Sequence, residues 1–179
     1  MTKICFEVPG RRRRELMEIA AGLRTSLKCS SPWFPILHVA EFDLPTVKPE
    51  FALTIGDIEE MGENHGLTFP ESHEIRLRSD VYQGVRDGKG RDRFTLAHEL
   101  GHYLLHSAPG LARSMSPVSA VPTYKNSEWQ ANTFAGSLLI SVEMARLVAD
   151  AEELASICGV TVDAARVQLS QYRLEGMLP

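Results

Sequence analysis

Apolar residues recur along much of the chain at the spacing of an amphipathic helix. Residues 11–27 carry leucine, isoleucine and alanine in this pattern directly after a Pro-Gly pair, which predicts the first helix. The following segment, 30–51, contains four prolines. Proline interrupts helices, so we expect at most a short helix near residues 36–42.

The pattern then changes to short β-type runs. Residues 51–55 and 73–78 have the composition of strands, and residues 64–72 between them are rich in turn formers. A helix over 80–87 follows, and two nearby glycines separate it from a longer helix over 91–106. A small sheet is therefore predicted just ahead of the longer helix.

The last part of the chain returns to helical spacing. Residues 107–126 predict a long loop, and helices are predicted over 127–140, 141–159 and 161–176. Thr161 is a favourable N-cap for the last of these helices.

Together these elements predict an α+β fold, a helix-rich single domain with a small β-sheet beside the helix of residues 91–106. We expect a main domain over residues 1–140, including the N-terminal helix and the sheet, and a C-terminal helical extension over 141–179. The helix pair of this extension resembles a helix-turn-helix. Its second half has few cationic residues, which favours packing or partner docking over DNA binding.

The composition is that of a soluble globular protein: 179 residues, 44% of them apolar and 23% charged. A net charge of -4 argues against nucleic acid as a partner, so we expect no direct nucleic-acid binding. No stretch has the pattern of a signal peptide or a membrane span, which predicts a cytoplasmic protein. Cys5, Cys29 and Cys158 are far apart, so neither a disulfide nor a cysteine metal site is predicted.

The sequence HELGH, residues 98–102, carries the strongest chemical signal. The pattern H-E-x-x-H arises in roughly 2% of shuffled sequences of this composition, so its surroundings must support it. Histidines four apart lie on one helix face about 6 Å apart along the axis, so His98 and His102 can direct both imidazoles at one ion. Glu99 lies at the edge of that face, within reach of a water on the metal. The alternative, two core histidines, requires a separate partner for each buried polar group.

A catalytic zinc site needs a third protein ligand. The metzincin pattern does not apply, because Leu105 and Ala108 stand where that pattern has glycine and histidine. His106 lies two turns beyond His98, about 12 Å along the axis, so both can hardly share one ion. We expect His106 to lie at the C-terminus of the helix, where the helix dipole favours a residue that can carry positive charge.

Glu128 is the stronger candidate for the third ligand. It begins a predicted helix face that continues with the small residues Ala131 and Ala135. Such a face allows another helix to approach closely, and Gly101 provides the matching notch on the HELGH helix. The spacing therefore predicts a gluzincin-type site formed by two helices.

The segments GRDRFTLAHELGHYLLH and EWQANTFAGSLLI together resemble the ImmA/IrrE family of metallopeptidases, over roughly residues 51–140. The resemblance implies a small zinc endopeptidase that holds one Zn²⁺ per chain. It further implies that His98, His102 and Glu128 hold the metal and that Glu99 is the catalytic carboxylate.

The resemblance also implies a substrate, a helix-turn-helix (Xre-type) transcriptional repressor whose cleavage derepresses stress or mobile-element genes. Ser141 departs from the family, which usually has proline there, and this affects the shape of the following loop. The alternative is a non-catalytic partner-binding protein of a toxin–antitoxin-like pair with a structural zinc site. Retention of Glu99 favours the enzyme, because a structural site needs no base. The activating signal and the oligomeric state stay open.

Three further features carry weaker expectations. The loop 107–126 links two ligand-bearing helices, so we expect it to border the substrate cleft. Tyr124, Tyr82 and His73 are equally ranked candidates for an oxyanion donor. The arginines at 11–14 favour a solvated helix end over a site for an acidic partner.

Overall fold

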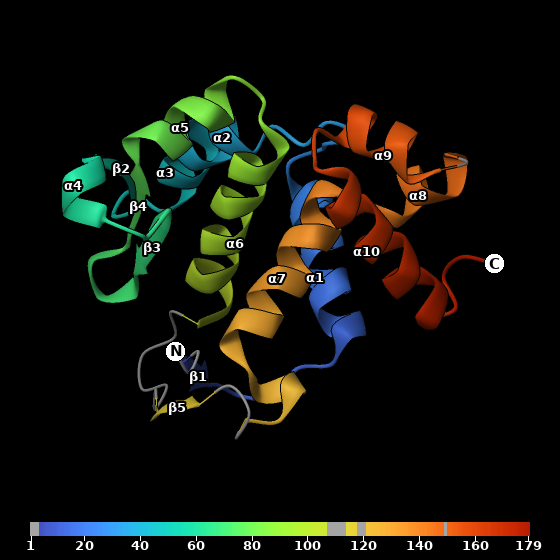
Figure 1. Ribbon diagram of the computed structural model, residues 1–179, viewed down its shortest axis with the longest axis horizontal. Helices are drawn as coiled ribbons and strands as arrows, with labels where there is room; N and C mark the ends of the chain where they lie inside the picture. The colour runs from blue at the N-terminus through green and yellow to red at the C-terminus, as the bar shows by residue number, and fades with distance from the viewer. Residues whose placement is uncertain (1–3, 107–113, 118–120, 149) are drawn as a thin grey trace.

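The computed structural model describes residues 4–106, 114–117, 121–148 and 150–179 (Figure 1). The helices are α1 (Arg13–Ser26), α2 (Ile36–His38), α3 (Leu44–Val47), α4 (Ile58–Met61), α5 (Ser79–Arg86), α6 (Gly90–His106), α7 (Ser127–Leu139), α8 (Val142–Leu147), α9 (Ala151–Cys158) and α10 (Val162–Leu174). The strands are β1 (Ile4–Glu7), β2 (Ala52–Gly56), β3 (Gly66–Phe69), β4 (Glu74–Arg78) and β5 (Ser114–Pro117).

A three-stranded sheet lies beside α6, as the α+β prediction requires (Figure 1). The strand order is β2-β4-β3, with β2 parallel and β3 antiparallel to the central strand. Ile75 and Leu77 alternate along β4 and are fully buried in the same core as Leu96 and Leu100 of α6. The helix-rich α+β class is confirmed.

Helix α6 packs along α7, and α7 packs along α1. Gly101 lies at a point of close approach, since a β-carbon there would lie 3.2 Å from backbone atoms of Ala131 and 3.1 Å from the Phe134 ring. Nearly any side chain at this position would therefore push the two helices apart. The notch predicted from Gly101 and the small-residue face is confirmed.

The buried Arg93 links α6 to the end of α9 and to the segment before α2. Its guanidinium donates hydrogen bonds to the carbonyl oxygens of Gly159 and Phe34, both at 2.8 Å, and lies 3.8 Å from the centre of the Trp33 ring. Burial lowers the pKa of Arg93 to about 10, so the group stays charged at neutral pH. Gly159 ends α9 with a φ of 64°, a conformation that favours glycine.

Three strands differ from the sequence prediction. The turn composition of residues 64–72 predicts a connection, but Gly66–Phe69 form β3 because β4 provides a partner. The predicted loop 107–126 contains β5, which pairs with the unpredicted strand β1. Residues 107–113 and 118–120 of that loop lie outside the described residues. Short strands depend on partners distant in sequence, which local composition does not reveal.

Two helices also differ from their predictions. The short helix near 36–42 continues to Val47 through a π-helical turn, and Pro45 falls in the first turn of α3, where its missing N–H is tolerated. The helix predicted over 141–159 is divided into α8 and α9. Asp150 starts the second helix by accepting a hydrogen bond from a backbone N–H three residues later.

One smaller prediction, the N-cap of the last helix, agrees with the structure. Thr161 caps α10 by accepting a hydrogen bond from a backbone N–H. Cys29 and Cys158 are free thiols, and the Cys5 side chain lies outside the described set. Among the described residues, no helix combines the length and apolarity needed to cross a membrane.

Candidate metal centre

Helix α6 places the two histidines of HELGH on one face. Their spacing of four residues brings the ring centres of His98 and His102 to 4.6 Å, with the rings nearly perpendicular. The two Nε2 atoms are 3.0 Å apart. Two ring nitrogens this close are well placed to share one cation.

Glu128 reaches the same point from the first turn of α7. Asn126 caps this helix by accepting a hydrogen bond from the Trp129 N–H at 3.0 Å. The Glu128 oxygens lie 3.1 Å from His102 Nε2 and 3.4 Å from His98 Nε2. In the described part of the chain, these three side chains form the one group of histidine, cysteine or acidic residues arranged to hold a metal ion.

The distances and the donor atoms fit a tetrahedral zinc ion. Ligand atoms about 2.1 Å from a tetrahedral centre are separated by about 3.4 Å. The nitrogen–nitrogen distance of 3.0 Å and the nitrogen–oxygen distances of 3.1 and 3.4 Å are close to that value. Two imidazoles and one carboxylate also match the ligands of catalytic zinc sites that keep a fourth position for water or substrate.

The histidines and the carboxylate stabilise each other's charge. Burial raises the pKa of Glu128, but hydrogen bonds and charge from His102 and His98 outweigh burial and hold the pKa well below its usual range. Burial lowers the pKa of His98, but its hydrogen bond to Glu128 and the charges of Glu99 and Glu128 outweigh burial and raise the pKa. Glu128 is therefore an anion at neutral pH, the state in which a carboxylate binds metal.

Glu99 lies beside this group and is held by β3. Its carboxylate is largely buried and accepts a hydrogen bond from the Thr68 hydroxyl at 2.7 Å. Gly66 provides the space, because a β-carbon there would lie 2.7 Å from the Glu99 side chain. Sequence reasoning missed both β3 residues, since they fall within the predicted turn.

His98 has a partner on its outer side. Asn132 Oδ1 lies 3.0 Å from His98 Nδ1, and an amide oxygen only accepts hydrogen bonds. Nδ1 therefore carries the ring proton in the neutral imidazole, and Nε2 presents a lone pair to the other ligands. Asn132 lies on the same predicted helix face as Glu128. This shared face is the sequence feature from which its contact with the metal-binding group could have been predicted.

His106 lies behind His102 and outside the metal-binding group. Its Nδ1 is 3.2 Å from His102 Nδ1, and its Nε2 is 3.1 Å from Gln130 Oε1. The expectation that His106 simply occupies a helix C-terminus is therefore incomplete. The residue is buried and contacts a candidate ligand directly.

A cleft of about 350 Å³ opens beside these side chains. Its described lining includes Phe6 of β1, the residues Gly66–Thr68 of β3, Glu99 and the three candidate ligands. A strand therefore lies directly along a cleft that contains a possible metal site.

The three oxyanion candidates do not line this cleft among the residues described. The Tyr82 hydroxyl donates a hydrogen bond to Glu41 at 2.6 Å, and His73 Nδ1 lies 3.0 Å from the Tyr103 hydroxyl. Tyr124 is half exposed, and its ring packs against Gly10.

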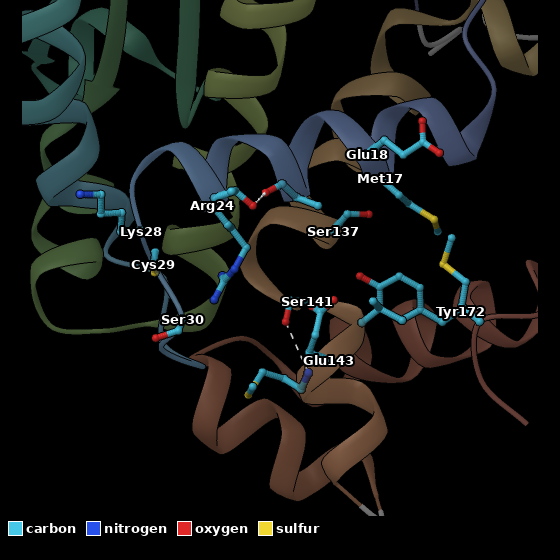
Figure 2. Close-up of a pocket in the computed structure, with 15 residues that line it drawn as sticks. Met17, Glu18, Arg24, Lys28, Cys29, Ser30, Ser137, Ser141, Glu143 and Tyr172 are labelled. Atoms are coloured by element: carbon cyan, nitrogen blue, oxygen red, sulfur yellow. Dashed lines mark hydrogen bonds between the residues drawn. The ribbon is translucent and has the colours of Figure 1, made fainter.

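A larger cavity of about 640 Å³ lies between α1, the start of α8 and α10 (Figure 2). The Arg24 side chain enters from α1, and its guanidinium donates a hydrogen bond to the Leu138 carbonyl oxygen at 2.8 Å. On the opposite wall, the Tyr172 hydroxyl donates to the Ile140 carbonyl oxygen. No group of possible metal ligands lies there among the described residues, whereas the smaller cleft is lined by His98, His102 and Glu128.

Comparison with known families gives one match. The profile of the IrrE N-terminal-like domain, a peptidase family, matches residues 58–170, which is more than half of the chain. The matched region contains HELGH, Glu128 and the β3 residues that hold Glu99. No curated protein matches the chain.

Proposed function

Since the chain belongs to the IrrE N-terminal-like (ImmA/IrrE) family of metallopeptidases, we propose that it is a zinc-dependent endopeptidase that cleaves a helix-turn-helix transcriptional repressor. One observation supports this proposal most strongly. His98, His102 and Glu128 form a group that can hold a metal, and Glu99 lies next to this group without being part of it. A structural zinc site would use four protein ligands and need no additional carboxylate. The arrangement supports an enzyme over a non-catalytic partner protein.

The roles of the side chains follow from their positions. Zinc, when bound, polarises the scissile carbonyl and acidifies the attacking water. Glu99 takes the proton of that water and later delivers it to the leaving amine. Thr68 holds the Glu99 carboxylate in place through its hydroxyl.

The edge of β3 supports a peptide as the substrate. Among the described strands, in the order β2-β4-β3, β3 pairs on one side only, and Gly66, Leu67 and Thr68 line the cleft. The outer backbone groups of an edge strand are free to pair with an extended segment of another chain. An extended peptide bound there would pass close to Glu99 and the metal ligands.

We expect Thr68→Val to lower kcat about tenfold and to leave zinc binding unchanged. Valine keeps the shape of threonine and removes the hydrogen bond to Glu99, a loss of about 1.4 kcal/mol in holding the base. Steady-state cleavage kinetics and metal content measure the two effects. Thr68→Ser restores the hydroxyl and should recover most of the turnover. Equal kcat values for the valine and serine variants would refute this role.

The repressor is proposed as the substrate on the basis of the family resemblance, and the net charge of -4 fits a protein partner better than nucleic acid. Purified protein should contain about one zinc per chain by mass spectrometry of metals. Incubation with the repressor encoded nearest to its gene should give two defined fragments. A chelator should stop the cleavage, and added zinc should restore it. A zinc-replete protein that leaves such repressors intact would rule out this substrate, and a protein without zinc affinity would rule out the proposed chemistry.

A further inference from the structure

A chain of hydrogen bonds links Gln130 and His106 to Nδ1 of His102, the ring nitrogen opposite the one that faces His98 and Glu128. The chain begins at Gln130, which is fully buried in α7. Its Nε2 donates to the carbonyl oxygens of Pro9 at 2.9 Å and Tyr124 at 2.8 Å. Carbonyl oxygens only accept hydrogen bonds, so the amide nitrogen must face them. The amide oxygen of Gln130 is therefore directed toward His106.

The orientation of the Gln130 amide also fixes which nitrogen of the neutral His106 ring carries the proton. Gln130 Oε1 lies 3.1 Å from His106 Nε2, and the oxygen is an acceptor, so Nε2 carries the proton of the neutral ring. His106 Nδ1 then has a lone pair, and it lies 3.2 Å from His102 Nδ1. His102 Nδ1 must donate to it. His102 consequently presents the lone pair of Nε2 toward His98 and Glu128.

We infer that His106 and Gln130 are positioning residues that hold His102 in the tautomer and orientation needed for metal binding through Nε2. This inference rests on the proposed zinc site. Histidine ligands commonly donate their second ring N–H to an acceptor that fixes the ring. Asn132 does this for His98, and a second histidine oriented by an amide does it for His102.

The burial of the chain supports a positioning role. His106 is 4% exposed and Gln130 is fully buried, so water does not readily replace either partner. The Gln130 amide is itself fixed by two backbone carbonyls from separate segments, one before α1 and one before α7. The contacts given by the described residues therefore agree on one direction of donation from His102 to His106 and from His106 to Gln130.

Two substitutions at His106 test the inference. Leucine fills similar space without an acceptor, whereas asparagine can place its Oδ1 near the position of the His106 Nδ1. We expect His106→Leu to weaken zinc affinity about 10- to 100-fold, measured by competition with a chromogenic chelator. His106→Asn should recover most of that affinity, although it loses the bond to Gln130.

A matched control separates positioning from general destabilisation. Tyr172 lines the larger cavity (Figure 2) and lies outside the metal site. Tyr172→Phe removes its buried hydrogen bond to the Ile140 carbonyl oxygen. It should lower the melting temperature without changing zinc affinity. Nitrogen NMR of the histidine rings in the zinc-loaded wild type should show His102 protonated at Nδ1 and bound to metal through Nε2.

The outcomes distinguish this inference from the proposed function. A wild type that binds no zinc overturns both. A wild type that binds zinc, together with an equal affinity of His106→Leu or with coordination of His102 through Nδ1, overturns the positioning role alone. Failure of asparagine to improve on leucine would also count against it, because acceptor chemistry would then not matter.

Discussion

Replacing Glu128 by glutamine should lower zinc affinity at least about 100-fold and remove peptidase activity. Glutamine has nearly the same shape, but it is neutral and a poor zinc ligand. It would leave only the two imidazoles of α6, and the negative charge that stabilises the ligand group would be lost. Zinc titration and cleavage of the repressor measure the two losses.

Glu152→Gln is a matched control for this variant. Glu152 pairs with Arg166 on exposed side chains and lies outside the metal group. It should retain wild-type zinc content and turnover, because exposed ion pairs contribute little to stability. If Glu128→Gln kept full zinc occupancy while His106→Leu lost all of its zinc, His106 rather than Glu128 would be the third ligand.

Glu99→Gln should keep about one zinc per chain and lose about 10²- to 10⁴-fold in kcat, the usual contribution of a general base. The side chain lies beside the ligands and hydrogen-bonds to Thr68, so the substitution removes the proton acceptor without removing a ligand. Zinc content and single-turnover cleavage should be measured on one preparation. Cleavage at the wild-type rate would show that Glu99 is not the base and would revive the alternative of a non-catalytic zinc protein.

The grouping of His98, His102 and Glu128 could be predicted because their arrangement is mostly local. A spacing of four residues on one helix brings His98 and His102 together, whatever the rest of the fold. Glu128 required one non-local step, the packing of two helices, and the glycine at 101 opposite the small face at Ala131 provided the signal.

The supporting contacts could not be predicted in the same way. Thr68 reaches Glu99 only because a four-residue segment of turn-like composition becomes an edge strand beside α6. The role of His106 depends on the side-chain amide of Gln130, which is in turn fixed by two backbone carbonyls, and one of them, at Pro9, is far away in sequence. Helical spacing places His106 correctly, but it does not indicate which hydrogen-bond partners other segments will bring.

The burial of Arg93 limits when α6 can pack into place during synthesis. Its charge is buried against carbonyl oxygens of Phe34, Cys158 and Gly159, and the last of these follows it by 66 residues. Burying a guanidinium before those acceptors exist is unfavourable. During synthesis, the HELGH helix therefore leaves the ribosome before Gly159 does. Arg93 of α6 can form its hydrogen bond to the Gly159 carbonyl oxygen only after Gly159 has emerged. The hydrogen bonds that hold α6 through Arg93 can therefore be completed only after residue 159 has been synthesised, well after the HELGH residues themselves.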